Sequence, residues 1–66
     1  MNFQAGQLVY ISGLRAHWGV IKEVDRDLHT NLEILRVSWV SHPRRIGTED
    51  WLWASETRLI EKEPSK

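Results

Sequence analysis

Apolar and polar residues alternate in short runs along this chain, and the alternation predicts β-strands rather than helices. The run 33–40, EILRVSWV, shows this most clearly, because Leu35, Val37 and Trp39 share one face and Arg36 lies on the other. No window longer than about ten residues keeps apolar residues at the spacing of a helix face. We therefore predict five strands, at 7–11, 17–24, 33–40, 50–54 and 58–61.

The second run, HWGVIKEV at 17–24, departs from simple alternation. Val20 and Val24 have one parity, whereas Ile21 has the other. A glycine inside a strand often marks a bulge or a close approach of another backbone. We therefore expect a bulge or bend near Gly19, which would let all three apolar side chains reach one core.

The segments between these runs predict how the strands are connected. Loop 41–49, SHPRRIGTE, is longer than the two to five residues that are usual in a hairpin, and extra length in a small domain is often functional. The segment 55–57, SET, suits a single 3₁₀ turn. Five short strands with one turn of helix before the last predict an all-β fold, a five-stranded antiparallel barrel that is closed or nearly closed. We expect one domain at 1–61 and a polar, frayed tail at 62–66.

Composition limits how this domain can be stabilised, what it can bind and where it acts. The chain has 66 residues, four tryptophans and no cysteine, so bulky apolar side chains rather than disulfides must stabilise a small core. Nine basic and nine acidic residues give a formal charge of zero, which disfavours dedicated duplex binding. The start, MNFQAG, does not resemble a signal peptide, and no apolar run approaches about 20 residues. We expect a cytoplasmic protein that does not enter a membrane.

Catalytic and metal-binding patterns are absent from the sequence. There is no nucleophile elbow, and Glu49 and Asp50 would point to opposite faces of an extended chain. The three histidines are separated by twelve and thirteen residues and have no cysteine partner, unlike zinc ligands: His17, His29 and His42. We therefore expect no enzyme, no cofactor and no metal site.

A family resemblance rests on four segments, GQLVYISGL, HWGVIKEVD, LRVSWV and DWLWASETRLIE. Together they resemble the SH3-like small barrels of the Tudor and KOW kind, and most of all the short barrel proteins of tailed bacteriophages, cyanophages among them. The similarity covers about residues 6 to 61, with departures at Gln7, in loop 41–49, and at Trp53 and Thr57. The resemblance implies a phage-encoded accessory or virion protein that acts in the host cytoplasm or the virion. Small barrels host many unrelated activities, so it implies a fold more strongly than a function.

Exposed aromatic and arginine side chains are the residues enriched at protein–protein contacts. The barrel pattern makes positions 39 and 51 apolar, so we predict Trp39 and Trp51 in the core or at its lip. The remaining candidates form our predicted contact surface for a host or virion protein: Tyr10, Trp18, Trp53, Arg44 and Arg45. The competing interpretation is that Trp18 and Trp53 only cap the two ends of a barrel.

Other binding functions remain open from the sequence. A KOW-like barrel could bind RNA or DNA with Arg15, Arg44 and Arg45 beside stacking aromatics, although neighbouring acidic residues offset this charge. An aromatic cage for a methylated cation is another interpretation, and it is drawn from Tyr10, Trp18 and Trp53 with Asp50 or Glu49. Open barrel edges could also pair between chains, so a homo-oligomeric structural subunit is a further hypothesis, and we expect either a monomer or a weak homo-oligomer.

Overall fold

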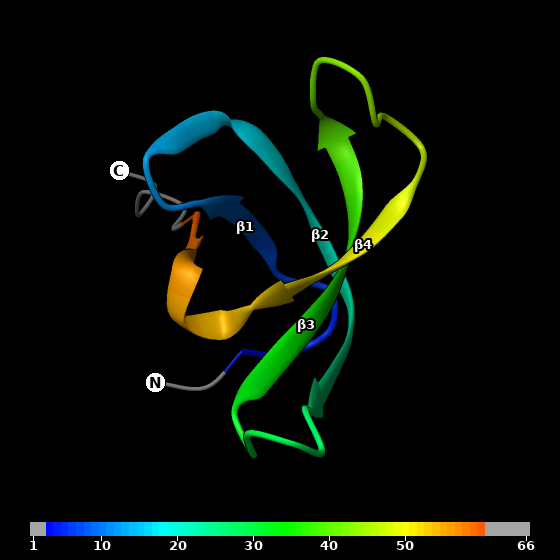
Figure 1. The fold of residues 1–66 in the computed structure, drawn as a ribbon. Coiled ribbons are helices and arrows are strands. Elements are labelled where there is room, and N and C mark those ends of the chain that lie inside the picture. The colour runs from blue at the N-terminus through cyan, green and yellow to red at the C-terminus, as the bar shows by residue number, and fades with distance from the viewer. Residues whose placement is uncertain (1–2, 61–66) are drawn as a thin grey trace, which may run out of the picture.

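The fold is all-β, as the alternation predicts. The computed structural model describes residues 3–60, which form one antiparallel sheet of five strands and a single 3₁₀ turn (Figure 1). The elements are β1 Leu8–Ile11, β2 Leu14–Arg26, β3 Glu33–Ser41, β4 Glu49–Trp53, η1 Ala54–Glu56 and β5 Thr57–Leu59. The predicted frayed tail, 62–66, lies outside the described residues.

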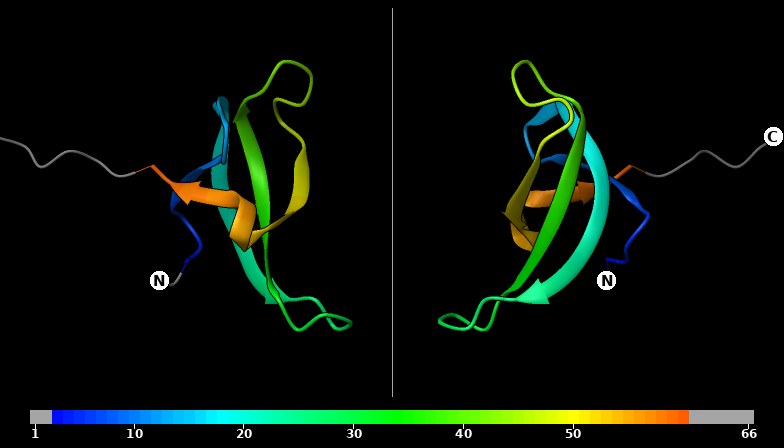
Figure 2. Two further views of the ribbon diagram at one scale, coloured as in Figure 1. Left: turned by 60° about the vertical axis from the view of Figure 1, so that its left-hand side comes forward. Right: turned by 90° about the vertical axis from the view of Figure 1, so that its right-hand side faces the viewer.

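The sheet curves strongly but does not close. Its strand order is β4-β3-β2-β1-β5, so β4 and β5 are the two edges. Within residues 3–60 the ladder pairs β5 with β1 and β4 with β3, and η1 carries the chain from one edge to the other (Figure 2). The five antiparallel strands are therefore confirmed, whereas the closed barrel is not.

The core lies on the concave face of the sheet. Its five buried apolar side chains come from β1, β2 and β3: Val9, Ile21, Leu35, Val37 and Trp39. The alternation of 33–40 thus predicted correctly which face of β3 is buried. Half-buried residues from the flanking elements pack around this cluster: Phe3, Ile11, Val24, Leu52, Ala54 and Leu59.

The strand β2 is bulged, as its broken alternation suggested. The pairing of β2 with β3 changes register between Trp18 and Gly19 and again between Ile21 and Glu23. The second change inserts one extra residue, so Ile21 and Val24 both turn toward the core although they are three residues apart. The predicted bulge near Gly19 is confirmed, but it does not bring all three apolar side chains to the core. The second shift places Ile21 and Val24 on the core face, and Val20 is not among the core residues.

The predicted burial of Trp51 is wrong. Its side chain is 48% exposed, whereas Trp39 is only 4% exposed. The reason is the indole N–H of Trp39, which needs an acceptor once it is buried. Asp50 Oδ2 accepts it at 2.7 Å, and this turns Asp50 toward the inner face of β4. Adjacent residues of a strand point to opposite faces, so Trp51 must face outward.

The 3₁₀ turn lies one residue earlier than predicted, at Ala54–Glu56 instead of 55–57. It is held by Thr57, which is 2% exposed. The Thr57 hydroxyl donates to the carbonyl of Trp53 at 2.8 Å. The buried hydroxyl therefore has a backbone acceptor at the start of the 3₁₀ turn and is not left without a partner.

Candidate functional site

Two indoles lie side by side on the outer face of the edge strand β4. Trp51 and Trp53 are 48% and 40% exposed. Trp51 pairs across the ladder with Arg36 and Trp53 with Ile34, so these four side chains share the face opposite the core. The chain thus places two of its four tryptophans on the solvent side of a small domain. We call these four side chains, together with Asp27, the Trp51/Trp53 surface.

This surface is hollowed. A pocket of about 340 Å³ is lined by Asp27, Ile34, Trp51, Leu52 and Trp53. Hydrogen bonds from the side chain and the backbone of Thr30 to Asp27 Oδ2, at 2.8 and 2.9 Å, lower the pKa of this carboxyl group. Asp27 is therefore ionised at neutral pH, and the pocket combines aromatic walls with a negative charge.

Arg36 lies next to Trp51, but its charge is already balanced. Its guanidinium binds Glu23 at 3.1 Å and also binds Glu49, and these two carboxylates raise the pKa of Arg36. Asp25, which pairs with Ile34 across the ladder, adds another carboxylate to the outer face. The surroundings of the two indoles are therefore acidic, a property suited to a cationic group and unsuited to phosphate.

Two of the predicted contact residues, Tyr10 and Trp18, form a separate cluster. They are direct partners across β1 and β2, both are half-buried, and the guanidinium of Arg15 lies 4.5 Å from the centre of the Tyr10 ring. Trp18 pairs with Ser41, at the opposite end of β3 from the partner of Trp53. Ile34 and Ser41 are seven positions apart along β3, which corresponds to roughly 23 Å at about 3.3 Å per residue. The structure therefore does not bring Trp53 together with Tyr10 and Trp18, and the aromatic cage drawn from these three residues has no geometric support.

The two predicted arginines of the β3–β4 loop differ from each other. Arg45 binds both carboxylate oxygens of Asp50, at 3.0 and 2.9 Å, so it braces the acceptor of the Trp39 indole. Its carbonyl also accepts from the backbone and the hydroxyl of Thr48, at 3.0 and 2.7 Å. Arg44 is exposed, and its backbone N–H donates to His42 Nδ1 at 3.2 Å. The long loop is thus ordered by its own hydrogen bonds, and Arg45 takes part in that order.

A pair of histidine rings lies beside the same loop. The ring centroids of His17 and His42 are 4.4 Å apart, and those of His42 and Trp39 are 4.9 Å apart. Partial burial lowers the pKa of His42, with further contributions from the charges of His17 and Arg45, whereas Asp50 acts in the opposite direction. The neutral form also suits the bond from Arg44, because Nδ1 can accept only when it carries no proton.

We expect acid to destabilise the domain through His42. The folded state lowers the pKa of His42, so the unfolded chain binds its proton first as the pH falls below about 6.5. Stability should be unaffected above this pH and should fall as the pH drops through the lowered value. Thermal unfolding at pH 7.5, 6 and 5 would show a smaller loss for His42→Gln than for the wild type, and equal losses would contradict the assignment. An NMR titration of the His42 ring should have its midpoint below that of a free histidine.

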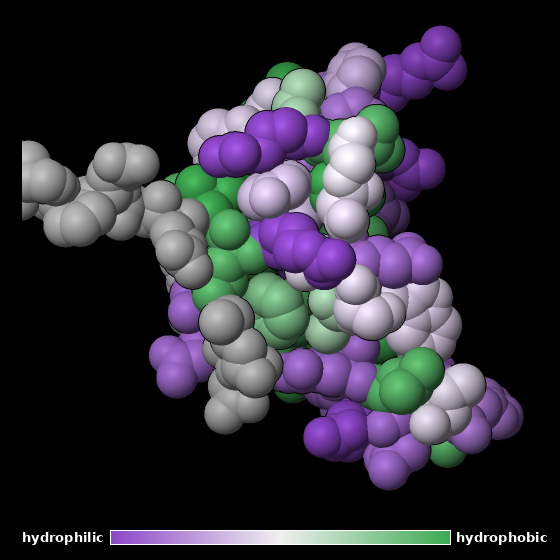
Figure 3. Space-filling model, turned by 90° about the vertical axis from the view of Figure 1, so that its left-hand side faces the viewer, coloured by the Kyte–Doolittle hydropathy of each residue, from purple (hydrophilic) through white to green (hydrophobic). Residues whose placement is uncertain are grey.

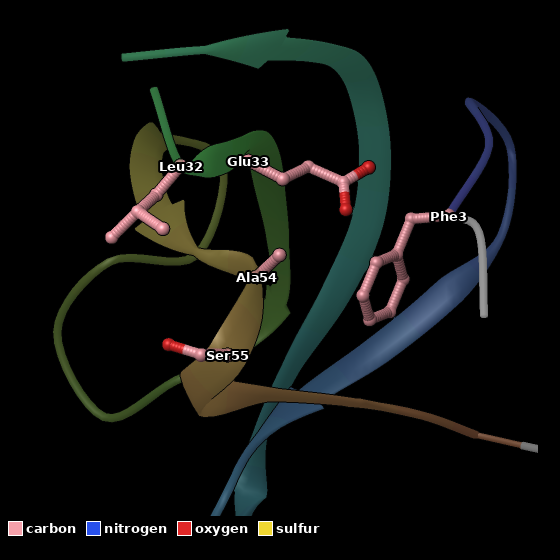
Figure 4. A pocket seen from close by; sticks show the side chains of 5 residues that line it. All are labelled: Phe3, Leu32, Glu33, Ala54 and Ser55. Carbon is pink, nitrogen blue, oxygen red and sulfur yellow. The ribbon is translucent and has the colours of Figure 1, made fainter. Parts of the chain in front are cut away.

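A second pocket, of about 300 Å³, lies at the same end of β3 as the first, where the strand begins at Glu33. It is lined by Phe3, Leu32, Glu33, Ala54 and Ser55. Figure 4 shows that the carboxylate of Glu33 and the hydroxyl of Ser55 point away from each other, so they do not form a base and nucleophile pair. Hydrophobic side chains also gather on the side of the molecule that carries β5 and η1, with hydrophilic ones around them (Figure 3).

No group of three or more metal-ligating side chains is found within residues 3–60. The same part of the chain contains no helix that is long and apolar enough to cross a membrane. No family model, no curated protein and no solved structure matches this chain.

Of the Trp51/Trp53 surface, the sequence predicted only Trp53 as a contact residue and missed Trp51, Arg36, Asp27 and Ile34. For Trp51 the necessary signal was present. Residues two apart in a strand share a face, so placing Trp53 outside the core already implied an exposed Trp51. Asp27 and Ile34 gave no such signal, because their position depends on the register between β2, β3 and β4.

Proposed function

We propose that this domain is a non-catalytic binding module and that it binds another protein through the Trp51/Trp53 surface. The observation that supports this most directly is the pair of exposed indoles on one edge strand. A domain of 66 residues has little apolar material for its core, yet it leaves these two large side chains in solvent. Tryptophan is among the residues most enriched at energetically important protein contacts.

The architecture supports a small-barrel scaffold for this function. The strongly curved sheet, the pairing of β1 with β5 and the 3₁₀ turn before β5 agree with an SH3-like small barrel that is open between β4 and β5. On the sequence resemblance, we further propose a phage-encoded accessory or virion protein, with a host or virion protein as its partner. The remaining predicted contact residues, Tyr10, Trp18, Arg44 and Arg45, are then secondary to Trp53.

Trp53→Ala is expected to abolish capture of the partner while the domain stays folded. The reason is that Trp53 contributes exposed apolar area and no buried core contact. The tagged wild type and the variant would each be incubated with a nuclease-treated lysate of the source cells, and the bound proteins identified by mass spectrometry. Lys22→Ala, another exposed position, is the control that should keep the partner. Retention of the same partners by Trp53→Ala, or unfolding of this variant, would contradict the proposal.

A second candidate function is single-stranded nucleic-acid binding at the Tyr10 and Trp18 cluster. It is favoured by the stacking of Arg15 on Tyr10, with Arg58 as the cross-strand partner of Tyr10 on β5. Aromatic rings and arginines are the side chains that bind bases and phosphates in such sites. Binding of a labelled oligonucleotide should then weaken steeply with added salt and be lost in Arg15→Ala, and salt-insensitive binding or none would exclude it.

A further inference from the structure

The open edge of β4 lies beside the Trp51/Trp53 surface. Antiparallel pairing directs the backbone groups of alternate residues toward the neighbouring strand. The N–H of Trp39 donates to the carbonyl of Thr48 at 2.9 Å, so Trp39 and, in the same alternation, Val37 and Leu35 direct their backbone groups toward β4. Their ladder partners Asp50 and Leu52 therefore direct their backbone groups toward β3. The backbone groups of the alternate residues, Glu49, Trp51 and Trp53, are therefore directed away from β3.

The carbonyl of Trp53 supports this orientation. It accepts from the Thr57 hydroxyl, which lies in the segment beyond β4 and not on β3. The end of the edge is thus occupied by the chain itself, whereas Glu49 and Trp51 keep backbone groups that point toward the open side. Within residues 3–60 no backbone partner lies on that side of Glu49 and Trp51, and an unpaired edge of this kind is a template for an added strand.

The charges around this edge select the kind of strand that fits. Asp27 is ionised and lines the pocket between the indoles, Asp25 lies on the same face, and Glu49 belongs to the edge strand. The guanidinium of Arg36 is shared by two carboxylates. A second copy of β4 would bring another Glu49 and Asp50 to this edge, whereas a basic segment would meet complementary charge.

We propose that the partner contributes an extended basic segment that adds to the open edge of β4. Its backbone pairs with Trp51, and one lysine or arginine side chain enters the pocket between Trp51, Trp53 and Asp27. The aromatic faces attract the cation and the carboxylate of Asp27 neutralises it. The inference rests on the proposed function, because it names the chemistry of the partner at the same surface.

A displayed library of random nine-residue peptides would test this inference. The library would be selected on the wild-type domain, and peptides that also bind Trp51→Ala/Trp53→Ala would be removed. We expect the remaining peptides to share one lysine or arginine with β-branched residues two positions away on either side. Replacing that basic residue with norleucine, or Asp27 with Asn, should weaken binding roughly tenfold, which corresponds to about 1.4 kcal/mol, because a partly desolvated cation contact is lost. Asn keeps the oxygen that accepts from Thr30, so Asp27→Asn should fold.

Backbone methylation of a selected peptide tests the strand pairing itself. N-methyl groups on the residues whose N–H groups face β4 should abolish binding, whereas methylation of the alternate residues should leave it unchanged. Equal effects at both sets would overturn the strand addition. Peptides that need both tryptophans but share no basic residue would overturn the inference that a cationic side chain enters the pocket. The proposed function would then remain intact. If no selected peptide depends on the two tryptophans, the inference and the proposed function both fail.

Discussion

Trp39→Ala is expected to unfold most of the protein. Trp39 is 4% exposed and packs in the core with Val9, Ile21, Leu35 and Val37. Truncating a buried tryptophan costs about 3–5 kcal/mol, because apolar burial is lost and a cavity remains. A single core in a domain this small rarely supplies more than about 3–5 kcal/mol in total. Urea unfolding followed by circular dichroism should therefore show a midpoint near zero denaturant.

Part of this loss comes from a polar contact. The Trp39 indole N–H donates to Asp50, and Asp50 is also held by Arg45. Without the indole, the carboxylate of Asp50 keeps Arg45 as its partner. The hydrogen bond that joins β4 to the core residue Trp39 is then lost. Trp39→Phe keeps much of the apolar volume and removes only the N–H, and we expect it to be clearly less destabilised than the alanine variant.

Trp51→Ala is the matched control for the same residue type. Half of the Trp51 side chain is in solvent, so we expect a loss of about 1 kcal/mol or less and a cooperative unfolding curve. Equal destabilisation of the two variants would contradict the assignment of Trp39 to the core and Trp51 to the surface. The peptide selection uses the double variant Trp51→Ala/Trp53→Ala, which requires that Trp51→Ala leaves the domain folded.

Local patterns predicted the strands because each is set by neighbouring residues. On β3, apolar residues at every second position predicted the buried face, and the structure buries Leu35, Val37 and Trp39. The broken alternation of 17–24 predicted a bulge, and two register changes are found. The ends of β2 were less predictable. The strand runs from Leu14 to Arg26 because its pairing with β1 and β3 continues through polar residues at both ends.

The candidate site was predicted only in part, because it depends on contacts between strands. Trp53 was placed outside the core correctly, but Trp51 was assigned to the apolar positions of a family pattern. The deciding contact is the bond from the Trp39 indole to Asp50, two residues that are eleven positions apart. The same contact explains why Arg45, predicted to face a partner, is engaged within the fold. Whether a sheet closes into a barrel likewise depends on the tilt and stagger of its strands, which the alternation of apolar and polar residues does not determine.

Gly19→Ala is expected to be the second most disruptive change. Gly19 is buried in β2 and pairs with Trp39 across the ladder. A Cβ atom at Gly19 would lie 2.2 Å from the carbonyl oxygen of Ser38 and 2.9 Å from Val37 Cγ1. The nearer atom belongs to the backbone of β3, so no change of rotamer can relieve the clash. The two central strands must separate, and we expect a loss of about 1–3 kcal/mol or more.

This loss would come from steric contact between strands and not from the backbone freedom of glycine. Gly19 does not have a positive φ, so alanine can adopt its backbone conformation and the Cβ atom alone causes the strain. Lys22→Ala, an exposed change in the same strand, should stay within about 0.5 kcal/mol of the wild type in the same urea experiment. If Gly19→Ala unfolds like Lys22→Ala, the close approach of β2 and β3 is wrong. Gly19 pairs with Trp39, so such a result would also contradict the β2–β3 register that brings Trp39 into the core.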